Sequence, residues 1–158
     1  MRPPRLGRTT LIAVDGPSGS GKTTYARRLA RQGATVISTD DFATWDDPVS
    51  WWPRLVDGVL TPLSEGRPGR YQKTEWADGH PYPGGYRRIE VPEVLVIEGV
   101  SAGRKSITDV LSWLVWCEVN DSPVRLANVV SRDGEQARIP MLTIPSENPV
   151  TTAHVRTP

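Results

Sequence analysis

Continuous apolar runs alternate along this chain with a helical pattern. Four runs of apolar residues, each ending at polar or acidic residues, predict buried strands at 11–14, 35–38, 94–97 and 113–119. Between the first two runs, residues 21–32 carry apolar side chains at helical spacing, and Gly33 ends the pattern. Strands that alternate with helices predict an α/β fold with a mostly parallel sheet.

Two segments do not fit this pattern. Residues 42–92 are rich in Trp, Tyr, Pro and Gly and are mostly aperiodic, so we expect a substrate-side insertion with one short helix over 53–63. Residues 139–158 hold four prolines and no apolar period, which predicts an irregular or disordered end. We therefore expect the C-terminal strand of the sheet to be missing, and an open sheet edge that a homodimer could cover.

Length and composition exclude several classes of protein. A chain of 158 residues predicts one domain, at 10–138, after a basic leader over 1–9. A net charge of +1 argues against a strongly basic nucleic-acid binder. No stretch approaches the roughly 20 apolar residues that span a bilayer, and the apolar run after Arg8 is too short for a signal peptide. We expect a cytoplasmic protein with neither membrane nor nucleic-acid partners, and the single cysteine, Cys117, excludes a disulfide framework.

A phosphate-binding motif lies between the first predicted strand and the first predicted helix. It fits G-x-x-x-x-G-K-[ST] and continues by one residue, as Gly16, Pro17, Ser18, Gly19, Ser20, Gly21, Lys22, Thr23 and Thr24. Glycines let the main-chain N–H groups curl around a phosphate, and the helix start offers further N–H groups and its positive dipole end. Lys22 can reach the β- and γ-phosphates, and the Thr23 hydroxyl can bind Mg²⁺. The motif predicts binding of a nucleoside triphosphate.

Several segments together resemble the uridine kinase-like branch of the P-loop small-molecule kinases. The likeness is firm over the first 42 residues, moderate at 94–100 and loose elsewhere, and is carried by Ile12–Thr24, Thr39–Phe42, Val94–Val100, Arg125–Ala127 and Arg132–Asp133. It implies a three-layer α/β/α P-loop NTPase fold with kinase-type strand order, a lid-like helix at 121–138, and ATP with Mg²⁺ as cofactors. It also implies transfer of the ATP γ-phosphate to a hydroxyl of a nucleoside or a similar small molecule. Neither the guanine-selecting motif of GTPases nor the signature of transporter ATPases is present.

Three acidic residues follow predicted strands, at the edge where ligands bind in such sheets. Asp40 is the first candidate for the base that takes the acceptor proton, and Asp41 is the second. The alternative is that one of them caps a following helix. Glu98 ends a buried strand, where an acid is costly unless it is paired or near a metal. We expect it to hold Mg²⁺ through water, with a structural hydrogen bond to the phosphate loop as the alternative.

Four further residues are candidates. Arg125 and Arg132 lie seven positions apart, so a helix would place both on one face as a phosphate clamp; a solvated face is the alternative. Members of the family it resembles usually carry further arginines where Asn128 and Val129 stand, so the lid departs from the family pattern. Tyr71 and Trp76 are candidates for stacking on a flat substrate, although aromatic residues in such an insertion more often pack a core.

Together these residues predict a kinase that uses Mg²⁺ and ATP to phosphorylate a hydroxyl of a small molecule, most readily a nucleoside. The first alternative is a kinase of the same architecture for a vitamin, a sugar or a nucleoside monophosphate. The second is a degenerate nucleotide-binding protein without transfer activity, which the altered lid and the short C-terminus would fit.

Overall fold

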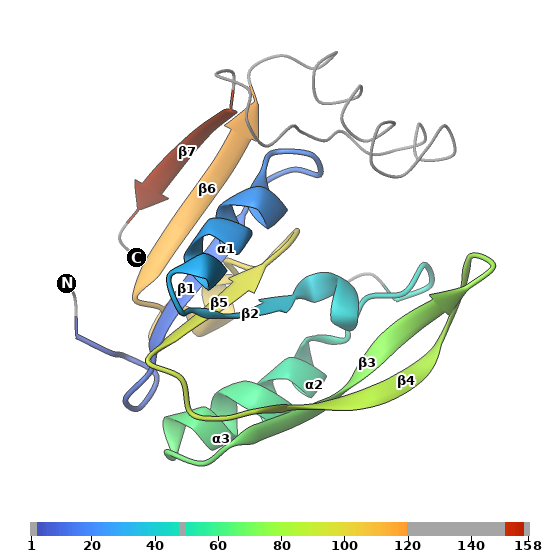
Figure 1. Cartoon of the computed structure of the whole chain (residues 1–158), viewed down its shortest axis with the longest axis horizontal. Helices are drawn as coiled ribbons and strands as arrows, with labels where there is room; N and C mark the ends of the chain where they lie inside the picture. Colours follow the sequence, from blue (N-terminus) through green and yellow to red (C-terminus); the bar gives the residue numbers. More distant parts are fainter. Residues whose placement is uncertain (1–2, 48–49, 120–150, 157–158) are drawn as a thin grey trace.

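The computed structural model describes residues 3–47, 50–119 and 151–156, and its centre is a five-stranded sheet. The strands are β1 (Thr10–Asp15), β2 (Thr35–Ser38), β5 (Val94–Glu98), β6 (Trp113–Val119) and β7 (Thr151–Arg156). Their order across the sheet is β2-β5-β1-β6-β7 (Figure 1). β1 pairs in parallel with β5 and β6, and β2 pairs in parallel with β5. The predicted α/β fold with kinase-type strand order is confirmed.

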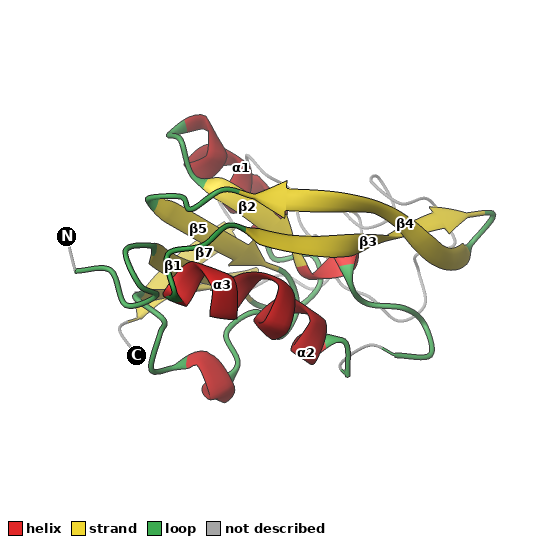
Figure 2. Cartoon of the chain, turned by 90° about the horizontal axis from the view of Figure 1, so that it is seen from below, coloured by secondary structure: helices red, strands yellow, loops and turns green. Residues whose placement is uncertain are grey.

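Helices cover both faces of the sheet, as Figure 2 shows. α1 (Lys22–Arg31) covers one face, and the opposite face is covered by a continuous helical run. That run consists of α2 (Trp52–Leu55), the π-helical turn η2 (Val56–Leu60) and α3 (Thr61–Ser64), and it confirms the helix expected at 53–63. Along β1, Leu11 and Ala13 belong to the core below α2 and α3, whereas Val14 belongs to the core below α1. The predicted strand is therefore apolar on both faces because both faces are covered.

The insertion contains a hairpin that the sequence pattern did not predict. β3 (Gly69–Ala77) and β4 (His80–Ile89) form a separate two-stranded antiparallel sheet. Most of β4 is exposed and it contains two prolines, so it lacks the apolar alternation by which a half-buried strand is recognised. Its base is nevertheless buried through Tyr71 and Ile89, and the guanidinium of Arg87 donates a 2.8 Å hydrogen bond to the carbonyl oxygen of Val36 in β2.

Both chain ends correct the expectations from the sequence. The expected loss of the last strand is wrong, because β7 pairs antiparallel with β6 from Val119↔Thr151 to Leu114↔Arg156. Main-chain hydrogen bonds define an edge strand of this kind, and its sequence, Thr-Thr-Ala-His-Val-Arg, shows little apolar pattern. The basic leader is also not free along its length, since Leu6 is buried. The predicted lid helix at 121–138, with Arg125 and Arg132, lies outside the described residues.

The expectations about a membrane and about a homodimer both stay predictions. Among the helices of the described residues, none is both long and apolar enough to cross a membrane. A homodimer stays a prediction, although β7 now covers the edge of β6 that gave one reason for it.

The packing of the helical run predicts that the insertion folds as one unit with the sheet. Leu55 is fully buried in the same core as Leu11 and Leu95. We expect Leu55→Ala to lower the free energy of unfolding by about 2–5 kcal/mol in a single cooperative transition, measured by urea denaturation. Asp57→Ala, at an exposed position of the same run, is the control and should change it by less than about 0.5 kcal/mol. A separate early transition in Leu55→Ala would show that the insertion is an independent appendage.

Candidate active site

The loop between β1 and α1 has the backbone that a phosphate cradle requires. Gly16, Gly19 and Gly21 adopt φ angles of 142°, 76° and 82°. A Cβ at Gly16 would collide with the carbonyl of Cys117 in β6, so the loop passes too close to the sheet for any side chain. Gly21 precedes α1 without a side-chain cap, which leaves the first N–H groups of the helix available to an anion.

Polar side chains of the loop are buried beneath this cradle. Lys22 is 8% exposed, and its ammonium donates a 2.7 Å hydrogen bond to the carbonyl oxygen of Pro17. Burial lowers the pKa of Lys22, against the opposing attraction of Glu98 and of Asp15. The Ser20 hydroxyl is fully buried and has no hydrogen-bond partner within the described part of the chain. An unpartnered hydroxyl and a buried cation in one loop fit a bound phosphate, which would satisfy both.

Glu98, at the end of β5, faces the first turn of α1. The Thr23 hydroxyl donates a 3.4 Å hydrogen bond to Oε2 of Glu98, whose side chain is largely buried. Burial raises the pKa of Glu98; a hydrogen bond from Ser38 opposes this shift, the negative charge of Asp40 adds to it, and Lys22 opposes it. Thr23 and Glu98 are thus the pair that could hold Mg²⁺. The described residues hold no cluster of three or more His, Cys, Asp or Glu side chains, and Mg²⁺ in such sites takes most of its ligands from phosphates and water.

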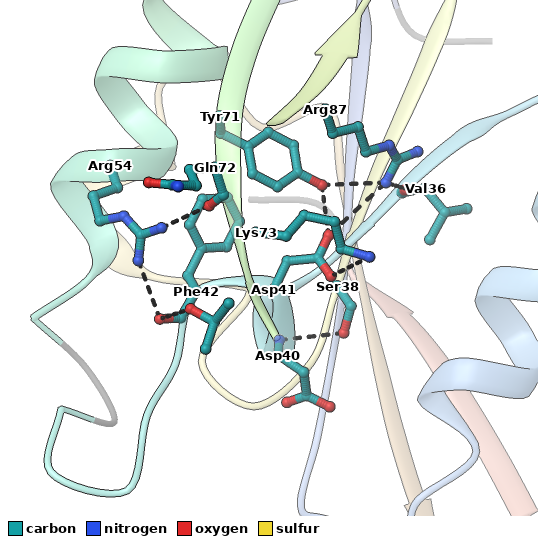
Figure 3. Close-up of polar contacts among 11 residues, drawn as sticks. Val36, Ser38, Asp40, Asp41, Phe42, Arg54, Tyr71, Gln72, Lys73 and Arg87 are labelled. Carbon is teal, nitrogen blue, oxygen red and sulfur yellow. Dashed lines mark hydrogen bonds and ion pairs between the residues drawn. The ribbon is translucent and has the colours of Figure 1, made fainter. Parts of the chain in front are cut away.

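The two acids after β2 have different surroundings. They lie in the 3₁₀ turn η1 (Thr39–Asp41), which Ser38 caps through a 3.3 Å hydrogen bond from the main-chain N–H of Asp40. The Asp40 carboxylate is exposed and, in the described part of the chain, has no hydrogen-bond or ion-pair partner. Figure 3 shows it pointing away from the cluster around Asp41. Neither acid caps the helix that follows in the described residues, because the start of α2 has no side-chain cap.

Asp41 is enclosed by three partners from the hairpin (Figure 3). The Tyr71 hydroxyl donates a 2.5 Å hydrogen bond to Oδ2 of Asp41, and the Lys73 ammonium lies 3.4 Å from Oδ1. The Arg87 guanidinium lies 4.0 Å from Oδ2 and also donates to the Tyr71 hydroxyl at 3.2 Å. Burial and the bond to Asp41 raise the pKa of Tyr71, so the phenol stays protonated as the donor. Asp41 therefore joins η1 to the hairpin, and Asp40 is the acid left available for chemistry.

The structure separates the two aromatic candidates. The Tyr71 ring is 4% exposed and packs on Phe42 with ring centroids 4.7 Å apart, so it has no open face on which a substrate could stack. Trp76 is 41% exposed near the tip of the hairpin, where it meets Trp45 edge-on at 5.3 Å. That tip extends beyond the sheet, at the end of the hairpin farther from α3 (Figure 1).

Sequence reasoning missed two sets of residues in this region. The sequence does not assign Lys73 or Arg87 to Asp41, because nothing local pairs residues that lie 32 and 46 positions away. Asp15, directly before the phosphate loop, also plays no part in the sequence-based predictions, yet its carboxylate accepts main-chain hydrogen bonds from both sides of the site. An acid at the buried end of a strand was the available hint.

Comparisons with known proteins bear on the family and the fold of the chain. The model of the AAA domain family matches residues 11–116. Among solved structures, the chain is similar to a possible uridine kinase from Bacillus stearothermophilus, with a TM-score of 0.51 and 20% identity over 68% of this chain and 70% of that one. At this identity the likeness shows the fold alone. A comparison with curated protein sequences finds no match.

The burial of Glu98 predicts that the free energy of unfolding depends on pH. Burial raises the pKa of Glu98 in the folded state, so the contribution of Glu98 to the free energy of unfolding is most favourable below pH 4.5, the ordinary pKa of the group. That contribution is lost as the pH rises through the folded-state pKa. Glu98→Gln removes the charge and should be spared this loss. We therefore expect the stability of Glu98→Gln relative to wild type to increase between pH 4.5 and 8 in urea unfolding without nucleotide. A difference that is constant with pH would contradict the burial of a charged Glu98.

Proposed function

We propose a function for this chain from the premise that it belongs to the AAA domain family and has the P-loop NTPase fold. We infer that it is a kinase, which transfers the γ-phosphate of ATP, with Mg²⁺, to a hydroxyl group of a small molecule. One observation carries the proposal. The exposed Asp40 lies at the same sheet edge as Lys22 and Glu98, close enough for its charge to act on both, so a proton acceptor stands beside a phosphate cradle and a metal-binding pair.

On the donor side, each residue would act on the triphosphate. The N–H groups of the loop and of the start of α1 hold the phosphate oxygens, and the Lys22 ammonium leaves Pro17 to contact the β- and γ-phosphates. Thr23 and Glu98 hold Mg²⁺, directly or through water. Bound Mg²⁺ supplies neutralisation of the phosphate charge. Ser20 Oγ gains an acceptor in a phosphate oxygen.

On the acceptor side, Asp40 would orient the acceptor hydroxyl and take its proton as the phosphoryl group arrives. Asp41 does not compete for this role because Tyr71, Lys73 and Arg87 enclose its carboxylate. The same three side chains tie η1 to the hairpin, which keeps Asp40 in one place. Arg125 and Arg132 stay proposed lid cations that would stabilise charge on the transferring group.

A nucleoside is the acceptor we propose first. The uridine kinase-like segments and the similar fold of a possible uridine kinase support this class of acceptor. Because Tyr71 is buried, stacking of a base would fall to the exposed aromatic residues of the insertion, of which Trp76 is our candidate. A vitamin, a sugar or a nucleoside monophosphate is the alternative acceptor.

Asp40→Asn tests the assignment of the base. It should bind ATP as wild type does, but its turnover should fall by about 10²-fold or more, because the amide cannot accept the proton. ATP affinity measured by calorimetry and ADP release measured in a coupled assay separate the two effects. Asp46→Asn, an exposed acid a few residues further along, is the matched control and should keep turnover. Unchanged turnover in Asp40→Asn would remove Asp40 from this role.

A panel of acceptors tests the function itself. Purified protein with Mg²⁺ and ATP would be offered nucleosides, nucleoside monophosphates, sugars and vitamins, with ADP release as the readout. Acceptor-dependent ADP release with a nucleoside supports the proposal, and release with another class reassigns the acceptor. Tight ATP binding without acceptor-dependent release across the panel would favour a nucleotide-binding protein without transfer activity.

A further inference from the structure

The carboxylate of Asp15 accepts three main-chain hydrogen bonds at the end of β1. Oδ1 accepts from the N–H of Gly16 at 2.7 Å and of Ser101 at 3.0 Å, and Oδ2 accepts from the N–H of Gly103 at 2.9 Å. The side chain belongs to a residue that is only 9% exposed. A buried carboxylate is costly unless several donors satisfy it, and here both oxygens are used. Gly16 belongs to the phosphate loop, whereas Ser101 and Gly103 belong to the turn after Glu98.

The turn over residues 99–103 is held by β1 at two successive positions. The N–H of Gly99 donates to the carbonyl oxygen of Val14 at 3.0 Å, and Asp15 holds the other end of the turn. Ser101 has a φ of 65°, which an L-residue rarely adopts and which persists only where the surroundings hold it. The bond from the N–H of Ser101 to Asp15 contributes to this restraint, beside the 3.2 Å bond from the N–H of Ala102 to the carbonyl oxygen of Gly99 within the turn.

Space beside the turn would allow it to move if the restraint were lost. A hollow of about 350 Å³ lies between the phosphate loop and the turn, lined by Asp15, Gly16, Pro17, Val100, Ser101 and Trp116. No packed side chain fills this volume, so packing alone does not fix the turn on this side. Glu98 directly precedes the turn, and its carboxylate must stay near Thr23, which donates to it at 3.4 Å.

We propose that Asp15 is a positioning residue for Mg²⁺, because it clamps the phosphate loop to the turn that directly follows Glu98. This inference rests on the proposed function, since it takes Thr23 and Glu98 as the magnesium-binding pair. Asp15 would act through its hydrogen bonds to the main chain, which use three of the roughly four acceptor positions of its carboxylate. Outer partners of this kind typically change metal affinity by about 10–100-fold when they are replaced.

Asp15→Asn is the variant that tests the clamp. The amide keeps one acceptor oxygen and places an NH₂ group against a main-chain N–H, so at least one of the three bonds is lost. Hydrogen exchange of residues 99–103 should become about 10-fold faster, because the turn opens locally. Calorimetry with ATP should show that the gain in affinity on adding Mg²⁺ falls by about 10-fold or more, while affinity for ATP in EDTA stays close to wild type.

Two further variants make the result specific. Asp109→Asn, an exposed acid outside the site, is the control and should match wild type in both measurements. Ser101→Gly relieves the strained φ, so adding it to Asp15→Asn should restore part of the exchange protection and part of the Mg²⁺ dependence. If Asp15→Asn acted only by lowering the stability of the whole protein, adding Ser101→Gly would not restore the Mg²⁺ dependence. Should Asp15→Asn not fold, Asp15→Glu, which moves the same carboxylate by one methylene, carries the same measurements.

The outcomes separate the clamp from the function on which it rests. Faster exchange at 99–103 together with a reduced effect of Mg²⁺ on ATP affinity supports the inference, and a reduced effect of Mg²⁺ with wild-type exchange at 99–103 overturns it. Wild-type behaviour in both measurements, or faster exchange with an unchanged Mg²⁺ effect, overturns it while the proposed function stands. If the wild-type protein binds ATP neither with nor without Mg²⁺, the proposed function fails, and the positioning role fails with it.

Discussion

The parallel register of β2, β5, β1 and β6 places every element of the candidate site. Val14 lies opposite Glu98 and Asp15 opposite Trp116, while Ser38 is also in register with Glu98. β2, β5 and β1 therefore end within one residue of each other, and the segments that follow them meet beyond the carboxyl ends of these strands. The phosphate loop, the acids of η1 and the turn after Glu98 come together for this reason. A shift of one residue in a single strand would turn its side chains to the opposite face, and the residues of the site would no longer meet.

Burial of opposite charges gives the site its electrostatic character. Desolvation lowers the pKa of Lys22 and raises that of Glu98, so the fold holds both groups at a cost in the absence of a ligand. Asp15 meets the same problem in another way, by accepting three main-chain donors. A triphosphate with its metal would complement Lys22 and Glu98 together, because it brings negative charge to the first and positive charge to the second. Sites in which burial perturbs neighbouring titratable groups are typical of functional sites.

The insertion is joined to the sheet by side-chain contacts of its hairpin and by a shared core. Asp41 binds Tyr71, Lys73 and Arg87, and Arg87 continues to the carbonyl of Val36 at the sheet edge. The ring of Tyr71 packs on Phe42, which directly follows Asp41. Movement of the hairpin would therefore displace η1, where Asp40 is exposed. The acceptor side and the donor side of the proposed reaction are connected through this one turn.

Local sequence determined those parts of the protein whose physical cause is local. The four apolar runs, the helix from Lys22 and the glycines of the phosphate loop follow from burial on both faces and from backbone curvature, and each can be recognised within about a dozen residues. The hairpin and β7 could not be recognised in this way, because their main-chain pairing leaves little apolar pattern when a strand is exposed. Only the tertiary structure decided that Tyr71 and Arg87 enclose Asp41 and that Asp15 reaches Ser101 and Gly103. Those contacts join positions 30 to 88 residues apart, and no local preference specifies a partner at that distance.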